Sequence, residues 1–236
     1  MNKFAPLTIA IFAAASSAQV IDFEAFPNLS SPADNVELDR NVVFTSNGVG
    51  ASFGFDSTGN GLADVNAVFE RVGRDSQEGF YANNVGNGRD VALAGSLGTY
   101  FLRHHVALGD NPEPFIITFD QGVGATSGEI WDIDARGDGS YEQWLVTGYD
   151  AAGGIVDQIA SPVGLKPSEA GNLDSLGWTF SLNALGSAID RVTIEYTGTA
   201  KGVGLAFDNF SAAAVPAPAA AAVLGLAGLG IARRRR

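Results

Sequence analysis

The sequence predicts an all-β protein whose body is an antiparallel β-sandwich. Short alternating apolar runs, separated by Gly, Asn, Asp and Ser, recur through residues 19–214, and the 236-residue chain contains 30 glycines. Helical periodicity is weak and confined to residues 168–176, and neither an internal repeat nor a linker divides the body. We therefore expect one sandwich domain at 19–214, with a signal helix before it and an apolar helix after it.

The N-terminal segment has the three parts of a secretory signal peptide. Lys3 provides the positive charge, residues 7–15 form a short apolar run, and Ser16 and Ala18 are small residues at the −3 and −1 positions of a cleavage site. We expect residues 1–18 to be the signal peptide, cleaved after Ala18. The alternative is a buried N-terminal helix.

The first strands of the body are predicted from alternation of apolar and polar residues. Residues 20–24 form a strand-like run directly after the cleavage site. In residues 115–119, the side chains of Phe115, Ile117 and Phe119 fall on one face.

Three further segments complete the predicted sandwich. Residues 143–149 and 155–159 flank a hairpin turn at 150–154. Residues 189–196 form a strand, and residues 203–210 form the last one. In the 189–196 strand the two faces are Val192, Ile194 and Tyr196, and Arg191, Thr193 and Glu195.

The C-terminal segment, residues 215–236, also has three parts. Two prolines interrupt regular structure at its start, residues 219–232 carry no charge, and four arginines end the chain. A membrane crossing needs about 20 apolar residues, so the segment is marginal as a permanent anchor. The arginines would stay on the cytoplasmic side.

This order of features resembles the PEP-CTERM sorting signal of Gram-negative bacteria. Ala217 departs from the family pattern, which usually has glutamate there. The resemblance implies an exosortase-type processing protease as partner, transient anchoring in the inner membrane, tail removal, and a final location at the cell surface or in an extracellular, often polysaccharide-rich, matrix. A simple tail anchor is the alternative. The sorting-motif residues are Val215, Pro216, Pro218, Arg233, Arg234, Arg235 and Arg236.

Charge and composition exclude several functions. The formal net charge is −12, and five of the 14 basic residues lie in the two terminal segments, so the body is strongly acidic. A nucleic-acid partner is therefore not expected, whereas divalent cations are permitted. The chain has no cysteine, which excludes disulfides, thiolate chemistry and cysteine-based zinc sites.

Two phrases at the ends of the body carry a second resemblance. "VIDFEAF" and "GVGLAFDNFSA" resemble the adjacent first and last strands of carbohydrate-binding-module-like jelly rolls. The resemblance implies a jelly roll with a structural calcium joining those strands. The matching candidate ligands are Glu24 and Asp208, with Asp22 and Asn209 nearby. The alternative is that Asp208 and Asn209 only hydrogen-bond the strand edge.

Two other acidic segments are weaker calcium candidates. "DSTGNGLAD" resembles the start of a calcium loop, but Thr58 replaces an acidic residue and Ala67 falls where a glutamate is needed, so a glycine-rich turn is the alternative.

The segment "DIDARGDGSYE" is expected to form a hairpin. Asp132 and Asp134 share a face of a strand, and a turn around Asp138 would return Glu142 toward them. We predict either metal binding by Asp132, Asp134 and Asp138, or a polar hairpin tip that keeps the sheet edge soluble.

No catalytic residues are predicted. His104 and His105 are adjacent, so on a strand they point to opposite faces, and a strand end explains them better than a catalytic base. The chain has no Gly-x-Ser-x-Gly elbow and no phosphate-binding loop, and no single carboxylate pair stands out for glycoside hydrolysis. We therefore expect no enzymatic activity.

Sugar binding would need an exposed aromatic face beside polar groups. Trp131 and Tyr141, which flank the acidic hairpin, are the candidate platforms. The leading hypothesis is an exported, non-catalytic surface or matrix protein that acts in adhesion or associates with exopolysaccharide in a biofilm. A calcium-dependent glycan-binding module and a secreted polysaccharide hydrolase or lyase are the alternatives.

Overall fold

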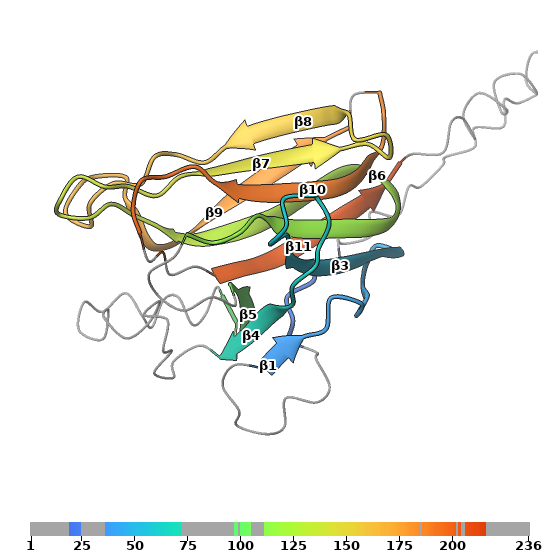
Figure 1. Ribbon diagram of the computed structural model, residues 1–236, viewed down its shortest axis with the longest axis horizontal. Coiled ribbons are helices and arrows are strands. Elements are labelled where there is room, and N and C mark those ends of the chain that lie inside the picture. The colour runs from blue at the N-terminus through green and yellow to red at the C-terminus, as the bar shows by residue number, and fades with distance from the viewer. Residues whose placement is uncertain are drawn as a thin grey trace, which may run out of the picture.

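The computed structural model describes residues 19–24, 36–71, 97–98, 100–104, 111–184, 186–201, 203 and 206–215. The named strands in these residues pair in antiparallel ladders and no helix is present among them, which confirms the predicted all-β class (Figure 1). The described part of the chain contains no helix with the length and apolarity required to span a membrane. The strands are β1 (Val36–Leu38), β2 (Phe44–Ser46), β3 (Val49–Phe55), β4 (Ala67–Arg71), β5 (Tyr100–Arg103), β6 (Phe115–Ile133), β7 (Trp144–Tyr149), β8 (Ile155–Ala160), β9 (Leu173–Asn183), β10 (Ile189–Tyr196) and β11 (Ala206–Ala214).

The long strand β6 belongs to both layers of the sandwich. Its first part pairs with β3 and β10, and its second part pairs with β9 and β11. Val123 is the junction, since it pairs with Ile189 of β10 and with Ala214 of β11. One layer therefore runs β2-β3-β6-β10-β7-β8, and the other runs β9-β6-β11-β5-β4-β1. A strand that changes sheets in this way forms a corner of the sandwich.

A glycine allows the β6 strand to bend at this corner. The pairing with β10 shifts register between Ile189 and Arg191, opposite residues 118–123 of β6. A Cβ atom on Gly122 would lie 2.6 Å from the Cβ of Ala188, which is closer than side chains pack. Glycine thus lets β10 approach the bend closely.

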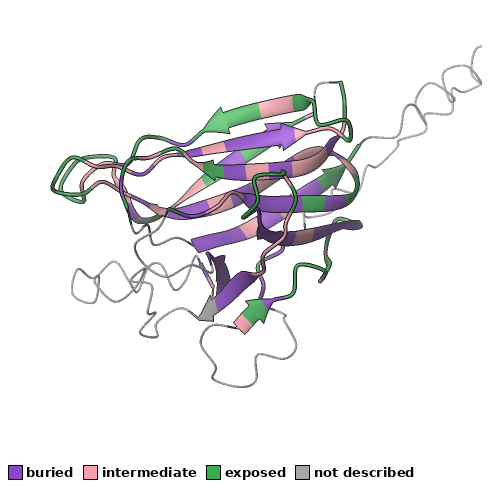
Figure 2. Cartoon of the chain, viewed as in Figure 1, coloured by how far each residue is buried: buried purple, intermediate pink, exposed green. Residues whose placement is uncertain are grey.

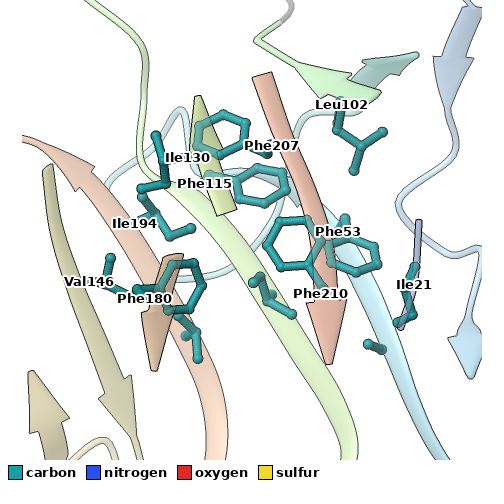
Figure 3. Close-up of a cluster of buried hydrophobic side chains, with 14 of the residues drawn as sticks. Ile21, Phe53, Leu102, Phe115, Ile130, Val146, Phe180, Ile194, Phe207 and Phe210 are labelled. Carbon is teal, nitrogen blue, oxygen red and sulfur yellow. The ribbon is translucent and has the colours of Figure 1, made fainter. Parts of the chain in front are cut away.

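Phenylalanine rings from both layers fill the core (Figure 3). The rings of Phe115 and Phe207 stack with centroids 4.5 Å apart, and Phe53 lies 5.0 Å from Phe210. Exposed positions concentrate on the edge strand β8, whereas β3, β6 and β11 are largely buried (Figure 2). The core thus joins the two ends of the body to its central strand.

Several predicted elements are confirmed. Phe115, Ile117 and Phe119 are all buried at the start of β6. The 189–196 strand is β10, with Val192 and Ile194 in the core. The predicted hairpin is formed by β7 and β8.

Other predictions were wrong in their bounds or type. The first strand is reduced to one bridge, in which Ile21 and Phe210 exchange two backbone hydrogen bonds. The last strand begins at Ala206 rather than residue 203 and extends to Ala214. The weak helical periodicity of residues 168–176 corresponds to a turn that leads into β9. In these segments, pairing with distant strands determines the strand bounds, and the local sequence pattern does not.

The predicted terminal segments lie outside the described residues. These are the signal helix at 1–18 and, apart from Val215, the tail at 215–236 with Pro216, Pro218, Arg233, Arg234, Arg235 and Arg236.

Candidate functional site

A β-bulge near the end of the chain positions the first candidate ligand. The pairing of β11 with β6 shifts register between Asp208 and Ser211, and Asn209 takes a left-handed backbone conformation with φ of 55°. Asparagine tolerates this conformation better than most residues. Because of the bulge, Phe207 and Phe210 both enter the same core, although regular alternation would place residues three positions apart on opposite faces.

Asp208 therefore lies on the opposite face of the sheet from the main core, directly across from Glu129 of β6. Its side chain is buried, and its Oδ1 atom has no hydrogen-bond partner within the part of the chain that the structure describes. The pKa of Asp208 is raised to about 9, chiefly by burial and additionally by the carboxylates of Glu129, Asp22 and Glu24. A buried acidic oxygen without a partner is costly unless a cation or proton satisfies it.

Residues 19–24 bring two more carboxylates towards Asp208. Ile21 bridges to β11, and the ring of Phe23 is buried in the core, 5.5 Å from the Phe53 ring. Asp22 and Glu24 alternate with these anchors and reach the electrostatic surroundings of Asp208. The predicted neighbours Glu24, Asp208, Asp22 and Asn209 are thus gathered by the fold.

The Glu24 carboxylate packs against the backbone of Gly98, a position without a side chain, and we call this arrangement the cradle around Glu24. Its Oε1 accepts a hydrogen bond of 2.9 Å from the backbone amide of Tyr100. Gly98 has a φ of 74°, and a Cβ atom there would overlap the same Oε1 atom. The backbone at Gly98 and at Tyr100 therefore accommodates this carboxylate.

Glu129 is a member of the cluster that sequence reasoning missed. Its Oε2 accepts hydrogen bonds from the Asn209 side-chain amide at 2.8 Å and from the Trp131 indole at 3.1 Å. Alternation along "EIW" places Glu129 and Trp131 on one face, but only the pairing of β6 with β11 shows that Asp208 lies opposite.

These residues fit a calcium ion, which takes about six to eight oxygen ligands in flexible geometry. The orphaned oxygen of Asp208 and the cradle around Glu24 are the two observations that support the fit. The cluster is loose, because no three of its acidic side chains bring oxygens within 4.8 Å of one another. We call it the first-and-last-strand site, with Asp22, Glu24, Glu129 and Asp208 as its carboxylates and Asn209 as a neighbour.

The acidic hairpin is organised differently from its prediction. The turn forms around Asp138, whose Oδ1 accepts hydrogen bonds from the amide and hydroxyl of Ser140. These hydrogen bonds lower the pKa of Asp138, and the side chain is exposed and is not part of the oxygen cluster. Asp132 and Asp134 do come together, and their third partner is Asp174 of β9.

The aromatic candidates offer little exposed ring surface. Trp131 is 4% exposed and packs with Leu97, Phe101 and Ala206, which corrects its prediction as a sugar platform. Tyr141 is half-buried beside the hairpin. The other two tryptophans do not replace them, since Trp144 is fully buried and Trp178 is half-buried against the core.

The "DSTGNGLAD" segment forms a turn closed by its own aspartate. The Oδ1 and Oδ2 atoms of Asp56 accept hydrogen bonds from the amides of Thr58, Gly59, Asn60 and Gly61. These bonds occupy the oxygens that a calcium loop would need, so the glycine-rich turn is the better description.

His104 follows directly after β5, and its ring contacts the carboxylate of Glu113 at 2.5 Å. This position agrees with the predicted strand end, and His105 lies outside the described residues.

The chain is a β-sandwich in which acidic side chains gather where the N-terminal segment meets β11. No protein-family model matches the chain, and no curated protein matches it. Among solved structures it is similar to the crystal structure of a DUF4465 family protein from Bacteroides caccae. The identity is 13%, the match covers 85% of this chain and 100% of the other, and the TM-score is 0.50. This likeness supports the sandwich fold.

A second structural match is a family 11 carbohydrate-binding module from Clostridium thermocellum, solved in complex with a beta-1,3-1,4-mixed-linked tetrasaccharide. Its identity is 10%, its TM-score is 0.24, and the match covers 78% of this chain and 98% of the module. At this level of similarity we draw no conclusion from it.

Proposed function

We propose that this chain is an exported, non-catalytic β-sandwich protein that is stabilised by calcium at the first-and-last-strand site. The observation that carries the proposal is the buried Oδ1 atom of Asp208, which lacks a hydrogen-bond partner among the described residues while three nearby carboxylates act on it electrostatically. A calcium ion there would neutralise the cluster and join the N-terminal segment to β11. The role of the ion is structural.

The location follows from the ends of the chain. Residues 1–18 direct export, and residues 215–236 act as a sorting tail for an exosortase-type protease, after transient anchoring in the inner membrane of a Gram-negative bacterium. The mature protein resides at the cell surface or in the extracellular matrix. There it serves adhesion or associates with exopolysaccharide in a biofilm.

Calcium titration by isothermal calorimetry tests the structural part of the proposal. The chain should bind calcium, and Asp208→Asn should lose the first-and-last-strand site, since the substitution removes a charge but keeps the shape. Glu195→Gln, at an exposed position on β10, removes one charge elsewhere and should bind as the unchanged chain does. Equal binding by Asp208→Asn and Glu195→Gln would contradict the proposed site.

Mass spectrometry of the protein recovered from its native host tests the location. We expect a mature N-terminus at Gln19 and loss of the tail that begins near Val215. Recovery of an intact chain from the cytoplasm would overturn the export proposal. Titration with soluble extracellular polysaccharide tests the matrix role, because saturable binding to one defined glycan would instead favour a lectin-like module.

A further inference from the structure

The base of the β6–β7 hairpin gathers four acidic side chains from three segments. Asp132 and Asp134 stand at the end of β6 and just after it, and Glu142 stands just before β7. Asp174 comes from β9, which pairs with the end of β6 through Ile133 and Leu173. None of these residues belongs to the first-and-last-strand site.

Three of the carboxylates already have the spacing of a metal centre. Asp132, Asp134 and Asp174 each offer one oxygen, and these oxygens all lie within 4.8 Å of one another. Ligands on opposite sides of a calcium ion are about 4.6–5.2 Å apart, because each bond is about 2.3–2.6 Å long. The three oxygens therefore fall within the coordination sphere of one ion.

The backbone is irregular where these residues meet. Asp132 has a φ of 69°, although it is not glycine, and the pairing of β6 with β9 shifts register between Trp131 and Ile133. Such a bulge redirects a side chain out of the normal alternation. Ordinary alternation would keep Asp132 and Asp134 one strand repeat apart. The bulge occurs where their carboxylates approach each other.

Glu142 is the independent observation that points to a ligand. Its side chain is 4% exposed, and its Oε2 atom has no hydrogen-bond partner among the residues included in the structure. Its amide donates a 2.9 Å hydrogen bond to the carbonyl of Asp134, so the residue lies directly across the hairpin from the cluster. Glu142 is not one of the three residues whose oxygens all lie within 4.8 Å of one another, but Asp134 and Asp132 act electrostatically on its carboxylate. A buried carboxylate oxygen near other carboxylates requires a cation or a proton.

The electrostatics agree with this position. The pKa of Glu142 is raised to about 10, chiefly by burial and then by the charges of Asp134 and Asp132. Burial, followed by Asp174, also raises the pKa of Asp134. Arg136 lowers both pKa values, but its side chain is exposed and its effect is smaller than that of burial.

We propose that the base of the β6–β7 hairpin is a second divalent-cation site, separate from the first-and-last-strand site. Its charge and its all-oxygen ligands select calcium, a hard cation that accepts several carboxylates in irregular geometry. Bound there, calcium fastens the hairpin to β9. The ligands are Asp132, Asp134, Glu142 and Asp174.

The test counts calcium ions bound per chain by equilibrium dialysis of the chelator-stripped full chain against calcium alone. The concentration should exceed about 10⁻³ M, the upper end of the affinity range of extracellular calcium modules. We expect two ions on the unchanged chain and one on Glu142→Gln. Asp208→Asn should also bind one, so that a failure of either site is seen separately. Glu195→Gln is the matched control and should bind two.

Glu142→Gln is expected to fold, because a protonated glutamate and glutamine have nearly the same shape and charge. In chelator near neutral pH its melting temperature should be at least that of the unchanged chain, because glutamine needs no proton uptake on folding, while its calcium-induced increase should be smaller. If this variant does not fold, the same count on Asp174→Asn decides. Two ions on a folded Glu142→Gln or Asp174→Asn chain, or a single ion on the unchanged chain that Asp208→Asn abolishes, would overturn the proposal.

Discussion

At the scale of single residues, Asp208 and Asn209 have complementary roles. Asn209 adopts the left-handed conformation that makes the bulge, and its side-chain amide binds Glu129. Asp208 is buried beside that carboxylate with one oxygen unsatisfied by the described residues. The bulge thus places Phe207 and Phe210 in the core while Asp208 and Asn209 belong to the polar site.

Substitution of Asn209 tests the backbone contribution. Both Asn209→Ala and Asn209→Gly lose the hydrogen bond to Glu129, but only alanine resists a positive φ. We expect the free energy of unfolding of the alanine variant to be lower than that of the glycine variant by about 1 kcal/mol. Chemical denaturation measures the difference, and equal stabilities would show that the bulge imposes no strain.

The buried acid predicts how stability depends on pH in chelator. The pKa of Asp208 rises from 3.8 in the unfolded chain to about 9 in the folded one, so the folded state holds a proton that the unfolded state releases between those values. Stability should therefore decrease as pH rises from about 4 to about 9. Melting temperatures at pH 5 and pH 8 measure this, and Asp208→Asn should have the smaller decrease. A steeper decrease in the variant would refute the assignment.

At the scale of elements, β6 connects the two sheets and both acidic sites. Gly128 lies in the second part of β6, where two phenylalanine rings pack against the strand. A Cβ atom on Gly128 would overlap the Phe210 ring and lie 2.9 Å from the Phe180 ring. Close packing of this kind makes the strand sensitive to a single added methyl group.

Gly128→Ala should lower the free energy of unfolding by about 1–3 kcal/mol, the usual cost of overpacking a core. Gly137→Ala is the matched control, because a Cβ atom on this hairpin-turn glycine meets nothing within 4 Å. Urea denaturation of the two variants compares them. A neutral Gly128→Ala would mean that the rings can move aside freely.

Elements with local causes were predictable, and those with distant partners were not. The turn at 150–154 has its own determinant, since Asp150 accepts amide hydrogen bonds from Ala152 and Gly154, and the flanking strands followed from it. The length of β6 was not predictable, because its two parts are defined by different partner strands. Asp174 was missed for the same reason: its approach to Asp132 depends on the pairing of β9 with β6.

At the scale of the whole molecule, aromatic packing unites the sandwich. The ring of Phe115 stacks on Phe207 and lies 5.0 Å from Phe55 and 5.9 Å from Phe210. These contacts join β3, the start of β6 and the last strand. The core therefore holds β11 in place from one face. The first-and-last-strand site lies on the opposite face of β11.

Phe115→Ala should lower the free energy of unfolding by about 3–5 kcal/mol, the usual range for a buried phenylalanine. Ile155→Ala on the edge strand β8 is the control, because Ile155 is 63% exposed and should change stability little. Thermal unfolding of both variants provides the comparison. A loss at Ile155 as large as that at Phe115 would contradict this view of the core.

The most direct test of the account is thermal unfolding of the chain in calcium and in excess chelator, with Asp208→Asn beside it. A ligand that binds only the folded state adds about 2.7 kcal/mol at a hundred times its dissociation constant, or roughly 5–10 °C for a domain of this size. We predict such an increase in the unchanged chain and a clearly smaller one in Asp208→Asn. No increase in the unchanged chain, or the same increase in both, would contradict calcium binding at the first-and-last-strand site.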